Sequence, residues 1–174
     1  LYIVANKNRI VLFADTTVTI APNAEEMAEI AFLAADTAKK IGIVPRVAML
    51  SFSNFGSSKH PYAAKVKRAT EIVKERCPEL QVDGEMQADT ALFEEKLNGL
   101  YEFNTLKKRA NVLIFPNLES GNIAYKLMRH FAGAEVLGPI LAGTNKPIHI
   151  LDRDCEVDDI VAMTAVAASE AQYI

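Results

Sequence analysis

The sequence has few cysteines, no excess of positive charge and no long apolar run. Cys77 and Cys155 are the two cysteines among 174 residues, and they form no CxxC or CxxH pattern, which argues against a disulfide framework or structural zinc. The formal net charge of −3 gives no global attraction for nucleic acid or an anionic membrane. No apolar run is long enough to span a bilayer, and polar residues interrupt the opening stretch where a signal peptide would be apolar. We therefore expect a reduced, cytoplasmic protein that binds neither nucleic acid nor membrane.

Motifs of several enzyme classes are also missing. The sequence contains no G-x-x-x-x-G-K-[ST] phosphate-binding loop. His60, His130 and His149 are scattered without a spacing such as H-E-x-x-H, so we expect surface or structurally satisfied histidines rather than catalysts. The chain begins inside an apolar, strand-like run without a methionine, from which we expect a fragment of a longer chain.

The sequence does contain a regular alternation of strand and helix patterns. Half of its residues are hydrophobic, enough to bury a core in one domain covering residues 1–174. Asn23 and Glu26 have the spacing of a capping box at the start of the first long helix. The alternation predicts an α/β fold, a three-layer arrangement with a mostly parallel sheet between helices. The expected strands are residues 1–5, 9–14, 46–50, 79–82, 110–115, 136–143 and 147–151, and the expected helices are 22–40, 63–76, 88–97, 123–131 and 157–171.

Three polar loops follow expected strands: "SFSNFGSS" after "RVAML", "DGEMQAD" after "ELQV", and "PNLESGN" after "ANVLIF". In open α/β sheets, ligands bind at the carboxyl ends of the strands, where loops lead into helices. Each loop alone is also what a helix-capping turn requires. Because all three fall at the same edge of one sheet, we expect them to form a binding cleft.

The first loop supplies the candidate ligand-binding residues Ser53, Asn54, Gly56, Ser57 and Ser58. Gly56 relieves steric limits on the backbone, and the last two serines lie near a helix start. Free N–H groups and the helix dipole at that point could hold a phosphate or another anion.

The second loop carries Asp83, Glu85 and Asp89, which could serve as metal ligands or as a general base. Asp89 equally suits a helix N-cap, and Gly84 suits a turn. Because no histidine or cysteine lies nearby, we expect no metal site here.

The third loop supplies Asn117, Gly121 and Asn122 as candidate ligand contacts, and Asn122 offers both amide donors and an acceptor. Lys126 and Arg129, one and two turns further on, are interpreted as a solvated helix face.

One further candidate is "LDRDCEVDDI", residues 151–160, in which a single arginine stands among five acidic residues. Arg153 could hold a phosphate with two parallel N–H groups. Alternatively this is a solvated, charge-balanced loop in which Asp158 and Asp159 stabilise the helix N-terminus.

Several long segments, in order, resemble the phosphate acetyl/butyryl transferase family. They are "VAMLSFSNFGSSKHP", "VDGEMQADTAL", "ANVLIFPNLESGNIAYKL", "GAEVLGPILAGTNKPIHIL" and "VDDIV", and together they cover nearly the whole chain. Members of this family move an acetyl group between coenzyme A and phosphate. The resemblance implies a fold similar to isocitrate and isopropylmalate dehydrogenases, with the chain forming one lobe and part of the other.

Two segments look more like the C-terminal domain of bacterial hybrid malic enzymes than like stand-alone transferases. They are "FADTTVTIAPNAEEMAEIA" and "SNFGSS", where stand-alone enzymes show a "GD" pair and an "STKGS" loop. In such malic enzymes the N-terminal part converts malate to pyruvate and CO2 with NAD(P) and a divalent metal, and the tail is thought to bind acetyl-CoA and help assemble the oligomer. The resemblance implies a cytoplasmic homo-oligomer whose domain here needs no cofactor of its own and binds acetyl-CoA or another phosphate-bearing molecule.

The family's catalytic residues fall on Asp152, Arg153 and Asp159, where the family has serine, arginine and aspartate. Arg153 and Asp159 match, but Asp152 replaces a hydroxyl with a carboxylate. Negative charge where an acyl phosphate must bind repels the substrate. The resemblance therefore favours a regulatory, acetyl-CoA-sensing and oligomerising domain, with an active phosphate acetyltransferase as the alternative and a purely structural dimerisation lobe as a third option.

Overall fold

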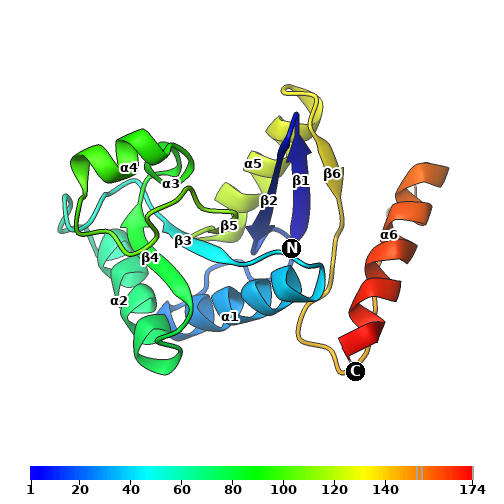
Figure 1. The fold of residues 1–174 in the computed structure, drawn as a ribbon, viewed down its shortest axis with the longest axis horizontal. Coiled ribbons are helices and arrows are strands. Elements are labelled where there is room, and N and C mark those ends of the chain that lie inside the picture. Colours follow the sequence, from blue (N-terminus) through cyan, green and yellow to red (C-terminus); the bar gives the residue numbers. More distant parts are fainter. Residues whose placement is uncertain (152, 154, 174) are drawn as a thin grey trace.

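The fold is a six-stranded sheet covered by helices on both faces (Figure 1). It comes from a computed structural model, which describes residues 1–151, 153 and 155–173. The strands are β1 (Tyr2–Asn6), β2 (Arg9–Ala14), β3 (Arg46–Leu50), β4 (Gln81–Met86), β5 (Val112–Ile114) and β6 (Glu135–Leu137). The helices are α1 (Ala24–Lys40), α2 (Pro61–Arg76), α3 (Ala88–Leu92), α4 (Glu94–Leu100), α5 (Leu118–His130) and α6 (Val157–Glu170), followed by a 3₁₀ turn at Ala171–Tyr173.

The sheet is mixed, with strand order β4-β3-β5-β2-β1-β6. Neighbouring strands from β4 through β2 are parallel, whereas β1 pairs antiparallel with both β2 and β6. The first two expected strands pair as a hairpin, and the parallel part lies where strand and helix alternate. The likeness to isocitrate and isopropylmalate dehydrogenases stays a prediction.

Alternation along the central strands builds two cores. In β3, Val47 and Met49 face α1 and α2, while Ala48 and Leu50 face the opposite side with α3, α4 and α5. All four side chains are buried. The expected three layers are therefore present.

The N-terminal cap of α1 follows the sequence prediction. The Asn23 side chain accepts the N–H of Glu26 at 2.8 Å, and Glu26 accepts the N–H of Asn23 at 2.8 Å, which completes the capping box. Gly42 follows the helix with a φ of 80°, a conformation that glycine adopts without steric cost.

Three element predictions need correction. The segment "DGEM" lies inside β4 rather than in a loop, because its backbone pairs with β3. The helix expected over residues 88–97 is divided at Phe93, whose extended backbone separates α3 from α4. The late strands reduce to β6 and a single bridge between Ile140 and His149.

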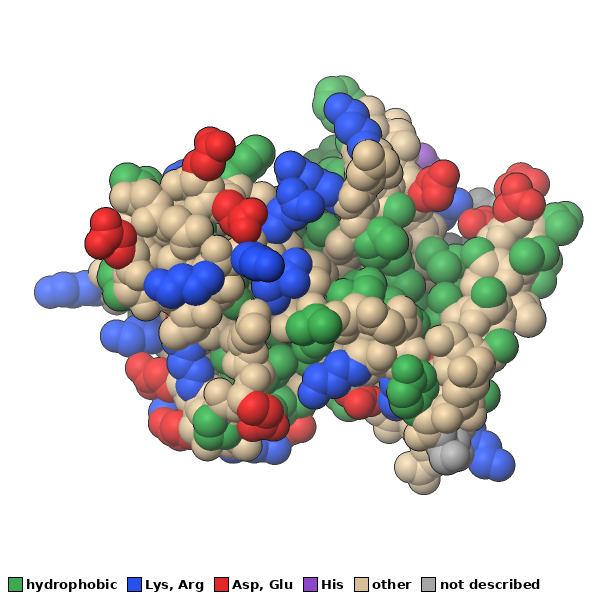
Figure 2. Space-filling view, in the orientation of Figure 1, with side chains coloured by type: hydrophobic (Ala, Val, Ile, Leu, Met, Phe, Trp, Pro, Cys, Tyr) green, Lys and Arg blue, Asp and Glu red, His purple; other side chains and the backbone are tan. Residues whose placement is uncertain are grey.

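The last helix, α6, lies at one end of the molecule, away from α2, α3 and α4 (Figure 1). Met163, Val166 and Glu170 are its buried residues. Hydrophobic side chains remain visible along this helix in the space-filling view (Figure 2). Among the described residues, no helix combines the length and apolarity that crossing a membrane would need.

Candidate functional site

A cavity of about 600 Å³ opens where β3 and β5 end and their loops lead into α2 and α5. All three expected edge loops contribute to it, since Ser51 and Phe52 come from the first, Ala88 from the second and Asn117 from the third. The volume falls within the range typical of small-molecule sites. The cavity is lined by Ala21, Leu50, Ser51, Phe52, Tyr62, Lys65, Ala88, Phe115, Pro116, Asn117, Glu119 and Ser120.

The serine hydroxyls of the first loop are used within the loop itself. Ser53 is buried, and its hydroxyl donates to Glu85 Oε1 at 2.8 Å and accepts the N–H of Ser58 at 3.0 Å. The Ser57 hydroxyl lies 3.0 Å from that of Ser53 and accepts the N–H of Asn54 at 2.9 Å. These bonds fold the loop around its own polar groups, so Ser53, Asn54, Ser57 and Ser58 do not line the cavity.

Glu85 is the buried acceptor that organises this loop from the neighbouring strand β4. Its Oε1 also accepts the N–H of Gly56 at 2.7 Å, and its carbonyl accepts the N–H of Phe55. The second carboxyl oxygen, Oε2, is buried without a hydrogen-bond partner among the described residues. Gly56 has a φ of 87°, which the tight turn requires. Glu85 therefore shapes the loop, a role that the sequence reasoning did not assign to it.

The side chain of Phe55 points to an aromatic cluster instead of the cavity. Its ring centroid lies 4.8 Å from that of Tyr101 and 5.0 Å from that of Phe103. Asn54 accepts the N–H of Gln87 at 2.8 Å, which ties the loop to the start of α3. The two residues that distinguish this loop from "STKGS" thus pack and bond the loop in place.

The third loop is held by the N-terminal cap of α5. Asn117 accepts the N–H of Ser120 at 2.9 Å through its side chain, and the Ser120 hydroxyl donates to the Asn117 carbonyl at 2.9 Å. The Asn122 amide donates to the carbonyl of Thr16 at 3.3 Å. Gly121 is buried against the turn after β2, where an added Cβ would overlap the Asp15 carbonyl oxygen. Asn117 alone of these three predicted contacts lines the cavity.

Asp15 organises that turn after β2. Its carboxylate accepts the N–H groups of Thr17 at 2.9 Å, Val18 at 3.2 Å and Thr19 at 2.6 Å. Burial acts to raise the pKa of the Asp15 carboxyl, but the three N–H groups outweigh it and hold that pKa below its usual value. The Asp15 carboxylate thus holds the turn together, and the backbone carbonyl of Asp15 packs against Gly121 of α5.

The sequence does not predict Lys65 as a cavity residue, nor the three aromatic residues Phe52, Tyr62 and Phe115. The Lys65 ammonium donates to the carbonyls of Pro22 and Pro116, both at 2.8 Å, and burial lowers its pKa. It lies on α2 three residues after Tyr62, so the two share a helix face. The spacing is visible in the sequence, but only the tertiary fold turns this face toward the cavity.

The family positions Arg153 and Asp159 lie elsewhere, near the start of α6. Asp159 accepts the N–H of Glu156 at 3.1 Å and lies 3.9 Å from the guanidinium of Arg129, in the last turn of α5. Arg153 is exposed. Asp152 lies outside the described residues. Asp159 therefore lies beside the C-terminal end of α5, whereas Asn117 caps the N-terminal end of the same helix. The two ends are about 20 Å apart along the helix axis.

A second cavity, of about 310 Å³, opens between α5 and the start of α6. Asp159 lines it together with Lys126, Arg129 and His130 from the last turns of α5, and with Cys155. The expected solvated helix face is thus part of a cationic wall that faces a predicted family residue.

The second expected loop contributes only Ala88 to the cavity, and its acidic side chains are not among the lining residues. Asp83 is buried and accepts Lys74 Nζ at 2.8 Å and the N–H of Thr105 at 2.6 Å. Asp89, in the first turn of α3, forms an ion pair with Lys96 of α4. The prediction that Asp89 is the N-cap is wrong, because Gln87 is the N-cap of α3. Among the residues that the structure describes, no group of three His, Cys, Asp or Glu side chains could hold a metal ion.

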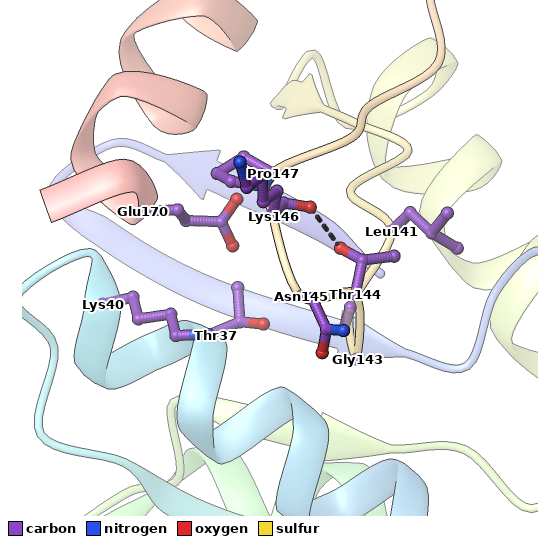
Figure 3. Close-up of a pocket in the computed structure, with 10 residues that line it drawn as sticks. Thr37, Lys40, Leu141, Gly143, Thr144, Asn145, Lys146, Pro147 and Glu170 are labelled. Atoms are coloured by element: carbon purple, nitrogen blue, oxygen red, sulfur yellow. Dashed lines mark hydrogen bonds between the residues drawn. The ribbon is translucent and has the colours of Figure 1, made fainter. Parts of the chain in front are cut away.

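The histidines behave differently from one another. His60 caps α2 by accepting the N–H of Tyr62 at Nδ1, whereas His130 lines the second cavity. His149 is buried 2.7 Å from Glu170 of α6, an ion-pair distance without hydrogen-bond geometry. Glu170 borders a small polar hollow of about 30 Å³, room for about one water (Figure 3). In Figure 3 its carboxylate extends from α6 toward Lys40 of α1.

Known proteins resemble this chain over nearly its whole length. The family described as "Phosphate acetyl/butaryl transferase" matches residues 1–168. The NADP-dependent malic enzyme of Escherichia coli is 48% identical over 160 residues, covering 91% of this chain and 21% of that protein. The phosphate acetyltransferase of Thermoanaerobacterium thermosaccharolyticum is 47% identical over 167 residues, covering 95% and 51%.

A solved structure shares the fold. The phosphotransacetylase of Streptococcus pyogenes superposes with a TM-score of 0.93 at 38% identity, over 99% of this chain and 53% of that one. The chain spans about half the length of the transferases it matches and about a fifth of the malic enzyme. Sequence and fold agree, and the chain belongs to the phosphate acetyl/butyryl transferase family.

Proposed function

We propose that this chain is the transferase-like C-terminal domain of a malic enzyme, which senses acetyl-CoA and supports a homo-oligomer without transferring acetyl groups. Relatives of both kinds match it at nearly equal identity, so identity alone does not separate the two functions. The choice rests on what the residues of the candidate site do.

The observation that carries the proposal is the inward-turned serine loop. The hydroxyls of Ser53 and Ser57 bond each other and Glu85, so they are not free to hold a reacting phosphate. Phe55 packs on Tyr101 and Phe103, where the transferase-like loop has a lysine. A loop that lacks a cation and uses its hydroxyls internally suits a binding wall better than a catalytic one.

The contacts of Asp159 also favour a sensing domain over an active transferase. A general base for the coenzyme A thiol needs a carboxylate free to approach it. Here Asp159 caps α6 through the N–H of Glu156 and lies near Arg129. The replacement of the family serine by Asp152 adds a sequence argument against transfer.

In the proposed mechanism, acetyl-CoA binds the cavity between the first loop and α5 and favours one arrangement of the oligomer. A ligand changes activity at a distance only by binding the two arrangements with different affinity. The oxidation of malate, with NAD(P) and a divalent metal, belongs to another part of the long polypeptide.

The test uses the full-length protein. We expect acetyl-CoA to shift the malate concentration for half-maximal rate, and no acetyl phosphate to form from acetyl-CoA and phosphate. Formation of acetyl phosphate at enzymatic rates would reject the sensor proposal. If acetyl-CoA neither binds nor changes malate kinetics, sensing is rejected and scaffolding remains.

An active phosphate acetyltransferase is the second candidate, favoured by the 310 Å³ cavity. Lys126 and Arg129 give that cavity a cationic wall next to Asp159, which suits an anionic substrate. If Asp152 is what prevents catalysis, Asp152→Ser should produce acetyl phosphate formation where the unmodified protein shows none. No gain in that variant would count against this candidate.

A further inference from the structure

A group of positive side chains, here called the cationic corner, lies where the parallel strands begin, at the other end of the sheet from the 600 Å³ cavity. It consists of Arg9, Arg46, Lys107, Lys108 and Arg109, all exposed except the half-buried Arg46. Among the described residues these five form no ion pair, whereas six other lysines and arginines do. Lysine and arginine side chains also gather near the middle of the space-filling view (Figure 2). The corner therefore presents positive charge that the protein itself leaves without a counter-charge.

The strands place Arg9 and Arg46 on the same face of the sheet. Arg46 alternates with Ala48, which belongs to the core beside α3, α4 and α5, and Arg9 alternates with Val11, which packs against that core. Both arginines thus point to the side of the sheet that carries this core. Their strands, β2 and β3, lie on either side of β5, and the register places the two Cα atoms about 12 Å apart. One extended partner can therefore reach both guanidinium groups.

Asn111 holds the starts of these strands together. Its side chain accepts the N–H of Arg46 at 2.7 Å and donates to the carbonyl of Val44 at 2.9 Å, and its own carbonyl accepts the N–H of Leu12 at 2.8 Å. The Arg46 side chain donates through Nε to the carbonyl of Arg109 at 2.8 Å. Because the backbone of the corner is held in place, binding a partner there orders little of the protein.

The two lysines of the corner extend from an equally held segment. The Lys107 N–H donates to the Asn104 side chain at 2.8 Å, and the Lys107 carbonyl accepts the Asn98 amide at 3.0 Å. The Lys107 ammonium donates to the carbonyl of Glu102 at 2.7 Å, so the contact involves the backbone and not the Glu102 carboxylate. Like charges held close together repel each other, and an anionic partner relieves that repulsion.

The surroundings of the corner favour an acidic polypeptide over nucleic acid. Its side chains line none of the cavities described above, so a partner meets them on the open surface. Val44 and Ile10, close to Arg46 and Arg9 in the sequence, are 70% and 52% exposed. Arginine beside apolar side chains is typical of protein interfaces. The net charge of −3 works against a long nucleic acid.

We propose that the cationic corner is a docking surface for an acidic segment of a partner protein. Guanidinium groups bind carboxylates through two parallel N–H···O bonds, so the exposed arginines pair with aspartate or glutamate side chains of that segment. The lysines add positive charge that attracts it. The inference goes beyond the proposed function, because the acetyl-CoA cavity uses none of these residues.

The test is fluorescence anisotropy of a labelled oligo-glutamate peptide with the full-length protein, compared with single-stranded DNA that carries the same number of charges. We expect the peptide to bind at low salt, to be released as salt rises, and to bind more tightly than the DNA. Absence of peptide binding at low salt overturns the proposal. Tighter binding of the DNA also overturns it, in favour of a nucleic-acid site.

Matched variants locate the binding. Arg9→Gln with Arg109→Gln removes two exposed charges and should weaken peptide binding about tenfold. Arg9→Lys with Arg109→Lys keeps both charges and should weaken it by no more than about threefold. The control is Lys59→Gln with Lys67→Gln, at two exposed lysines without ion pairs among the described residues, and it should change the affinity less than about twofold. Equal losses in the glutamine pair and the control pair would refute the site, as would unchanged affinity in both.

Charge reversal gives a second test of the same surface. Arg9→Glu with Arg109→Glu should abolish peptide binding, because like charges then face each other. Both side chains are exposed, so the Tm should not fall, and malate turnover should not change. Peptide binding that persists in the reversed variant, with its Tm unchanged, would contradict the docking surface.

Discussion

The contact between Gly121 and Asp15 gives a sharp prediction, because the chain contains a matched control. Gly121 lies in the first turns of α5, and an added Cβ would overlap the Asp15 carbonyl oxygen and lie 3.2 Å from Thr16 Cγ2 and 3.3 Å from Phe115 Cγ. Gly99 lies in α4 with nothing within 4 Å of its added Cβ. The same substitution to alanine therefore meets a packed turn in one helix and open space in the other.

The magnitudes follow from two opposing effects. Alanine stabilises a helix interior by about 0.5–1 kcal/mol relative to glycine, so Gly99→Ala should raise the free energy of unfolding by about that amount. At Gly121 the same gain is offset by overpacking, since backbone must move to accept the methyl group at a cost of about 1–3 kcal/mol or more. Because the obstacle is a backbone carbonyl rather than a flexible side chain, we expect Gly121→Ala to lose about 2 kcal/mol.

Urea denaturation followed by far-UV circular dichroism measures both values. For a chain of this length, 2 kcal/mol corresponds to a fall in Tm of about 4–8 °C. The slope of free energy against urea should not change, since neither variant alters the surface exposed on unfolding. If Gly121→Ala is as stable as Gly99→Ala, α5 does not pack against the Asp15 turn, and the described geometry of the third loop is wrong.

Three other predictions concern carboxylates, of which Glu85 and Glu170 are buried and Asp15 is half-buried. Glu85→Ala should lower the free energy of unfolding by about 3 kcal/mol, because Ser53 and Gly56 lose their acceptor. Glu85→Gln keeps an acceptor oxygen, so its free energy of unfolding should differ from that of the unmodified protein by no more than about 1 kcal/mol. Equal losses for the two variants in a urea titration would contradict this role of Glu85. The pKa of Asp15 is lowered in the folded protein, so its contribution to stability is present above the unfolded-state pKa and is lost as pH falls through the folded-state pKa. The difference in free energy of unfolding between the unmodified protein and Asp15→Asn should therefore shrink between about pH 5 and pH 2. A difference that stays constant over this range would contradict the role of Asp15. His149→Leu should lower the free energy of unfolding by about 3 kcal/mol, because it leaves Glu170 buried without its partner. Combining it with Glu170→Leu should recover most of that stability. Additive losses in the double-variant cycle would show that the two side chains do not interact.

Local patterns explain which parts of the fold could be predicted from the sequence. The capping box of Asn23 and Glu26 is confirmed because both partners lie within four residues. The "DGEM" segment was mispredicted because Gly84 and Asp83 read as a turn, whereas pairing with β3 extends them as a strand. Gly84 is needed there since an added Cβ would lie 2.8 Å from Met49 Cβ. Tertiary pairing overrides local preference at such positions.

The sequence predicts the sheet edge at which the cavity lies, but not which side chains line that cavity. The rule that ligands bind at strand carboxyl ends points to the edge where the structure has a cavity, and all three loops contribute to its lining. The sequence shows that Ser53 is polar but not where its hydroxyl points, because its acceptor Glu85 is 32 residues away. Tyr62 and Lys65 belong to a helix face, whose orientation depends on how α2 packs on the sheet.

Few contacts hold α6 on the rest of the protein, and this limits the lifetime of the second cavity. α1 buries seven residues, whereas α6 buries three. The polar contacts of α6 with the rest of the protein include His149–Glu170, Arg129–Asp159 and the Ser169 hydroxyl, which donates to the Lys40 carbonyl at 3.0 Å. Its backbone amides should therefore exchange with deuterium through local opening, well before those of α1. Each opening carries Asp159 away from Arg129, so the 310 Å³ cavity lasts only as long as α6 stays closed.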